Sequence, residues 1–121
     1  GSRLPRPLEE GTLLGLFQKD PRRKSLDAFP ELLAHLRALH PIRYRYLFQG
    51  LEVVYLTGLA PIGDQNDALR FVHFLDQLYN LGLELRLSGV PLEALFPETY
   101  RHGPFAKKYG RALSRLAELL G

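Results

Sequence analysis

The stretch "NDALRFVHFLDQLYNLGLELRLSGVPLEALF", residues 66–96, decides the fold. Its first half carries apolar residues at three- and four-residue spacing, which predicts an amphipathic helix. The apolar stripe consists of Ala68, Phe71, Val72, Leu75, Leu78 and Tyr79. Gly82 is suited to end this helix, and leucines then alternate with charged residues over 83–88. That alternation predicts a half-buried strand.

A second strand is predicted immediately before this helix. "LEVVYLTGL", residues 51–59, is a nearly continuous apolar run, which is typical of a strand covered on both faces. "APIGDQND" then turns the chain, and Asp64 or Asn66 can cap the helix. Strand, helix and strand joined by short links predict a right-handed βαβ crossover unit with a short parallel sheet. We therefore assign the chain to the α/β class.

Two helices are expected before this unit. The first is short, with an apolar set of Leu8, Leu13, Leu14, Leu16 and Phe17. "KDPRRKS" reads as a loop, and Ser25 can cap a second helix that runs to Leu39. The alternation in "IRYRYLFQG" suggests an edge strand, but a helix that leads into the next strand is equally possible. The sequence therefore does not decide between strand and helix for residues 42–49.

After the βαβ unit, "VPLEALF" predicts one or two helical turns and "PETYRHGP" a loop. Residues 105–120 then form a final amphipathic helix, which closes the domain at its C-terminal end.

The length of 121 residues predicts one domain, which we place at residues 8–121 after a flexible lead-in at 1–7. Gly1 and Ser2 look like the remnant of a tag, so we expect a piece of a longer protein. Hydrophobic residues at 45% and charged residues at 24% exclude a disordered chain, and the absence of Cys excludes thiolate chemistry. No apolar run is long enough for a membrane span, and we expect a cytoplasmic protein.

The final helix carries the main candidate site. Every formal charge between Glu98 and Glu118 is positive, and Lys107, Arg111 and Arg115 form one row at four-residue spacing. Such a row is either a solvated face or a contact for a phosphate or an acidic partner surface, which a guanidinium binds in bidentate fashion.

Other chemistry is sparse in the sequence. The four histidines lie on different elements without a helical partner, so we predict no metal site. No Gly-x-x-x-x-Gly-Lys-Ser/Thr segment is present, and we predict no catalytic residue and no cofactor bound by this chain alone. Ser88 ends a strand where nucleotide-dependent ATPases place a phosphate-sensing residue. The favoured interpretation is that Ser88 caps the strand and turns the chain into Pro91.

Two segments resemble the C-terminal part of the ZapE-type ATPases, bacterial relatives of the mitochondrial Afg-like P-loop ATPases. The resemblance covers residues 51–120. The matching positions in the helix and strand are Arg70, Phe71, Asp76, Leu78, Tyr79, Ser88, Val90, Pro91 and Leu95, and those in the last helix are Tyr109, Arg111, Ser114, Arg115, Leu116 and Glu118. Leu69, Ala112 and Leu119 depart from the Arg, Thr and Met of the family pattern.

The resemblance implies a parent protein that binds ATP and Mg²⁺, linked to cell division in bacteria and to protein quality control in mitochondria. This chain would then be a non-catalytic domain that packs on an upstream nucleotide-binding domain. Its candidate contacts with phosphate, a neighbouring subunit or a cell-division protein are Arg111, Arg115, Arg70 and Ser88. Arg70 is also open to a structural pair with a carboxylate.

Two other functions remain open from the sequence. One is a stand-alone protein-interaction module that uses the last helix or a surface formed by Tyr44, Tyr46 and Phe48. The other is weak nucleic-acid binding by residues 22–24 together with 43–46, where tyrosines could stack on bases. Nucleic-acid binding is the least favoured, because the same tyrosines suit a core.

Overall fold

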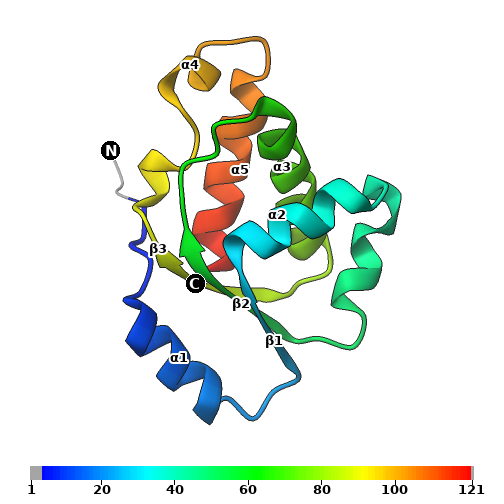
Figure 1. The fold of residues 1–121 in the computed structure, drawn as a ribbon, viewed down its shortest axis with the longest axis vertical. Coiled ribbons are helices and arrows are strands. Elements are labelled where there is room, and N and C mark those ends of the chain that lie inside the picture. The colour runs from blue at the N-terminus through cyan, green and yellow to red at the C-terminus, as the bar shows by residue number, and fades with distance from the viewer. Residues whose placement is uncertain (1–3, 121) are drawn as a thin grey trace.

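A three-stranded parallel sheet lies at the centre of the computed structural model, which describes residues 4–120 (Figure 1). The strands lie in the order β1-β2-β3, so β2 is hydrogen-bonded on both sides. The elements are α1 (Glu10–Lys19), β1 (Lys24–Ala28), α2 (Phe29–Ala38), the 3-10 helix η1 (Pro41–Phe48), β2 (Val53–Leu59), α3 (Gln65–Asn80), β3 (Glu84–Gly89), the 3-10 turn η2 (Leu92–Ala94), α4 (Glu98–Arg101) and α5 (Ala106–Leu119).

Helices cover both faces of the sheet. Alternate side chains of β2 point to opposite faces, and Val54 and Leu56 pack into the large core beneath α2, α3 and α5. Val53 and Tyr55 pack against Leu13 of α1, which stands apart from the other helices in Figure 1. This double covering explains the continuous apolar run in the sequence and confirms the α/β fold with a βαβ unit.

The first strand corrects a prediction. Residues 24–28 form the edge strand β1, paired in parallel with β2, and do not belong to the helix that we predicted from Ser25. Helix α2 begins only at Phe29, after an extended Ala28 and with a proline in its first turn. The sheet therefore has one strand more than the sequence pattern indicated.

Residues 41–48 form the 3-10 helix η1, which settles the choice between strand and helix in favour of a helix. Tyr44 and Phe48, four residues apart, point into the core, while Tyr46 is exposed. The Tyr44 hydroxyl donates to the Leu36 carbonyl at 2.9 Å, and the Phe48 ring lies 5.0 Å from that of Phe74. These two anchors fix η1 against α2 and α3.

Three smaller predictions have clear outcomes. Asp64, and not Asn66, caps α3 by accepting a hydrogen bond from the Asp67 backbone at 3.0 Å. The segment predicted as a loop near residue 100 contains the short helix α4. Leu8 lies outside the first helix and donates from its backbone to the Leu87 carbonyl at 2.8 Å, so the chain before α1 lines the outer edge of β3. Residues 1–3 of the predicted lead-in lie outside the described residues.

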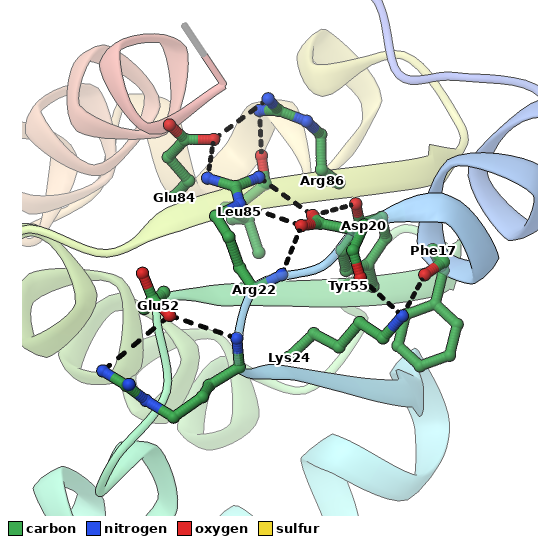
Figure 2. A network of polar contacts seen from close by, with 10 residues as sticks. Phe17, Asp20, Arg22, Lys24, Glu52, Tyr55, Glu84, Leu85 and Arg86 are labelled. Carbon is green, nitrogen blue, oxygen red and sulfur yellow. Dashed lines mark hydrogen bonds and ion pairs between the residues drawn. The ribbon is translucent and has the colours of Figure 1, made fainter.

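A network of charged side chains ties the loop after α1 to the sheet (Figure 2). Arg22 binds both oxygens of Asp20 and pairs with Glu84 at 2.9 Å, and Arg86 pairs with the same glutamate at 3.0 Å. The Tyr55 hydroxyl donates to Asp20 at 2.7 Å. The network lies where β3 begins, whereas ligands of open α/β sheets bind beyond the carboxyl ends of the strands. We therefore assign it a structural role.

Two aspartates should make the fold acid-sensitive. Hydrogen bonds from Arg22, and then from Tyr55, hold the pKa of Asp20 well below its usual range. Hydrogen bonds from Arg37 lower the pKa of Asp67 from its usual 3.8. Both pKa values are lower in the folded chain than in the unfolded chain. The two carboxylates therefore stabilise the fold fully at pH values above their unfolded pKa, and this stabilisation is lost as the pH falls from there through their folded pKa values. We expect the urea concentration at the unfolding midpoint to decrease as the pH is lowered through this acid range.

The variant Asp67→Asn tests this expectation. It weakens a bidentate pair with Arg37, so the free energy of unfolding at neutral pH should fall by about 2 kcal/mol. The acid dependence of its urea midpoint should also be shallower than in the wild type. Equal slopes for the two proteins would show that Asp67 does not contribute to the acid sensitivity.

Candidate functional site

Helices α3 and α5 pack side by side and run in the same direction. Tyr109, Ala112 and Leu116 form the buried face of α5. The polar contacts advance together along both helices, with Asp76 against Arg115 and one turn later Tyr79 beside Glu118. Two members of the row predicted from the sequence, Arg111 and Arg115, therefore lie beside α3.

Arg115 is held within this helix pair. It pairs with Asp76, and its guanidinium lies 5.1 Å from the centre of the Tyr79 ring. The neighbouring Glu118 carboxylate raises the pKa of the Tyr79 hydroxyl. These contacts link the two helices, so Arg115 acts in the structure as a helix-to-helix tie.

Arg111 lies differently from Arg115. It is exposed and lines a cleft of about 100 Å³ between α3 and α5, together with Lys108, His73, Asp76, Leu69 and Val72. Within residues 4–120 no carboxylate lies in ion-pair distance of Arg111 or Lys108. The carboxylate of Asp76 is already paired with Arg115. The cleft therefore presents two uncompensated cations and an imidazole over an apolar floor.

Arg70, a third predicted contact, lies in a carboxylate network. It pairs with the buried Asp67 at 3.1 Å, and Arg37 of α2 binds the same carboxylate at 2.8 and 2.9 Å. The structural pair that the sequence left open for Arg70 is thus present. Its guanidinium is half-buried on the first turns of α3 and does not line the α3–α5 cleft.

Ser88, the fourth predicted contact, is buried at the carboxyl end of β3. Its hydroxyl accepts a hydrogen bond from the Gly58 backbone at 3.2 Å, where the pairing of β2 and β3 becomes irregular. This contact agrees with the favoured interpretation that Ser88 completes the strand end. The four predicted residues do not converge on one site, because Arg111 lines the cleft whereas Arg115, Arg70 and Ser88 do not.

Lys108 and His73 line the cleft but are not among the contact residues predicted from the sequence. A usable signal existed, since Lys108 and Arg111 are three residues apart and share a helix face. The packing of α3 against α5 brings His73 close to Lys108 and Arg111, and no local sequence pattern predicts this packing.

Comparison with known families gives a direct result. The model of the AFG1-like ATPase family matches residues 18–121, which is most of the chain. The chain belongs to the AFG1-like ATPase family. This agrees with the resemblance found in the sequence and associates the chain with a nucleotide-binding ATPase. Searches of curated proteins and of solved structures returned no match.

The sequence motifs expected for ATP and Mg²⁺ binding in the parent protein are not found in the sequence of this chain. The sequence has no P-loop, and no Asp-Glu pair follows β2 or β3. Asp64, in the loop after β2, is engaged as the cap of α3. Within residues 4–120 there is no group of three His, Asp or Glu side chains that could hold a metal ion.

In the described part of the chain, no helix is long and apolar enough to cross a bilayer.

Proposed function

We propose that this chain is the non-catalytic C-terminal domain of an AFG1-like ATPase, and that Arg111 in the α3–α5 cleft contacts a phosphate or carboxylate outside the chain. The group contacted belongs to the nucleotide-binding domain or to a neighbouring subunit. In this proposal ATP and Mg²⁺ bind the nucleotide-binding domain, since the chain itself lacks the residues for them.

One observation carries the proposal. Of the arginines predicted as contacts, Arg115 and Arg70 each have a carboxylate partner within the chain, whereas Arg111 has none among the described residues. Its guanidinium therefore has the full set of donors available for an anionic group, with Lys108 beside it in the same cleft. The Asp76 to Arg115 pair fixes the two helices on which these cations stand.

The test uses the longer ATPase that carries this domain. We expect Arg111→Ala to lower ATP turnover or subunit assembly by about tenfold, because a charge-assisted bidentate contact contributes roughly 1.5 to 3 kcal/mol. Turnover is measured over a range of ATP concentrations, and assembly by sedimentation velocity. The two readouts separate a contact with nucleotide from a contact between subunits.

Two further variants serve as controls. Lys107→Ala removes an exposed cation of α5 that does not line the cleft, so turnover and assembly should stay unchanged. Arg115→Ala should lower the thermal stability of the domain, because the tie to Asp76 and Tyr79 is lost. If Arg111→Ala behaves like Lys107→Ala in both assays, the cleft has no contact function and the proposal fails.

A further inference from the structure

A second surface, away from the cleft, gathers large exposed apolar side chains. Ile42, Tyr46 and Leu81 are 70%, 56% and 52% exposed. Two hollows of about 430 and 360 Å³ adjoin there and share Arg45 and Tyr46. Ile42 and Arg43 line the first, and Leu81 lines the second. We call this surface, formed by Ile42, Arg43, Arg45, Tyr46 and Leu81, the η1 platform.

The platform is held in place from beneath. The buried Tyr44 and Phe48 anchor η1 through the Leu36 carbonyl and the Phe74 ring. The exposed residues of η1 therefore stand on a fixed backbone. Single exposed apolar residues are ordinary, but a joined set lining a hollow is typical of an interaction site. A fixed surface also loses little conformational entropy on binding.

The charge of the platform has one sign. The two segments that form it, residues 39–51 and 77–83, contain no Asp or Glu. Neither Arg43 nor Arg45 has a carboxylate within 4.0 Å in the part of the chain that the structure describes. Glu52 and Glu84, which directly follow the two segments, pair with arginines that do not belong to the platform. The apolar hollows are thus flanked by two uncompensated guanidinium groups.

We propose that the η1 platform docks an acidic peptide segment of another protein that carries a bulky apolar side chain. The apolar side chain enters the hollow between Tyr46 and Leu81, and flanking carboxylates meet Arg43 and Arg45. Tyrosine and arginine around an apolar pocket are the residue types that dominate binding energy in protein interfaces. The charge complementarity selects acidic partners and speeds their association.

Two other occupants fit the platform less well. A second copy of this chain would pair the surface with itself around a two-fold axis, and this brings the arginines of both copies together. Single-stranded nucleic acid needs several aromatic faces, but Tyr44 is buried and the Tyr46 ring already lies 5.1 Å from the Arg45 guanidinium. Ile42 and Leu81 offer no stacking surface to a base.

This inference does not depend on the proposed contact of Arg111. The platform shares no lining residue with the α3–α5 cleft, so either surface can fail its test while the other passes.

The test measures binding to the full chain by fluorescence anisotropy with three labelled probes. The first is a short peptide of glutamates flanking a central Leu-Phe pair, the second is the same peptide with glutamine for glutamate, and the third is a thymidine oligonucleotide. We expect the acidic peptide to bind about tenfold more tightly than the other two, and Leu81→Ser or the pair Arg43→Gln with Arg45→Gln to weaken it about tenfold.

Matched controls keep the result specific. Leu16→Ser and Arg6→Gln change an exposed leucine and an exposed arginine elsewhere, and both should bind the acidic peptide like the wild type. Circular dichroism checks that each variant is folded. The proposal is overturned if the glutamine peptide or the oligonucleotide binds equally well, or if the platform variants bind normally. It is also overturned if sedimentation shows a dimer that Leu81→Ser dissociates.

Discussion

Replacing Gly89 by alanine is expected to destabilise the folded protein strongly. The backbone there has φ near 128°, a conformation that side-chain-bearing residues rarely adopt. An added Cβ would lie 2.8 Å from the Leu59 Cα and still closer to the nitrogen and oxygen of that residue. Backbone atoms of the central strand cannot move aside as a flexible side chain can. We expect a loss of more than about 4 kcal/mol in the free energy of unfolding, measured in urea.

Gly110 provides the matched control for this substitution. It lies within α5 at an ordinary helical backbone, and a Cβ built there meets no atom within 4 Å. Gly110→Ala should therefore raise the free energy of unfolding by about 0.5 to 1 kcal/mol, since alanine favours the helix. If Gly89→Ala and Gly110→Ala unfold at the same urea concentration, the close approach of β3 to Leu59 is not present in solution.

The Gly89 result also bears on Ser88. Val90 donates to the Leu59 carbonyl at 3.0 Å, and Ser88 accepts from Gly58, so the strand end is fixed by three consecutive residues of the chain. The Ser88 hydroxyl and the Gly89 backbone thus both contact β2, which agrees with a structural role for the Ser-Gly pair at this strand end. A sequence shows the residue types at a strand end, but their hydrogen-bond partners on the neighbouring strand come only with the fold.

The elements that the sequence predicted correctly are those with a long local period. The apolar stripes of α3 and α5 repeat over many residues, so burial of one helix face follows from the pattern, and the continuous apolar run of β2 indicates burial of both its faces. The βαβ connection then follows from the order of the elements. The fold class can therefore be predicted from the sequence, because it depends only on the order of the elements and on which of their faces are buried.

Strand β1 was missed because its five residues have no such period. None of them is fully buried, and Leu26 is half exposed. Its strand conformation depends on pairing with β2, which comes 29 residues later in the chain at Lys24 and Val53. Ser25 at a plausible helix start then favoured the wrong assignment. The different environments of Arg111 and Arg115 also could not be predicted from a local pattern. The packing of α3 against α5 places Asp76 beside Arg115.

Replacing Phe71 by alanine is expected to cost about 4 kcal/mol of stability. The Phe71 ring is fully buried, lies edge-on to Phe29 of α2 at 5.2 Å, and stacks with Phe74 at 5.7 Å. Phe74 in turn contacts Phe48 of η1. Removal of the middle ring leaves a cavity where three helical elements meet, and their backbones can close it only in part. Urea unfolding measures the loss.

The control for Phe71 is an aromatic residue outside the core. Tyr46→Ala removes a side chain that is 56% exposed, so the free energy of unfolding should change by no more than about 0.5 kcal/mol. The two variants separate the roles of aromatic residues in this chain: Phe71 supports the helices that carry the candidate surfaces, whereas Tyr46 forms part of one. Equal destabilisation by the two substitutions would mean that η1 packs differently and that Tyr46 is not available to a partner.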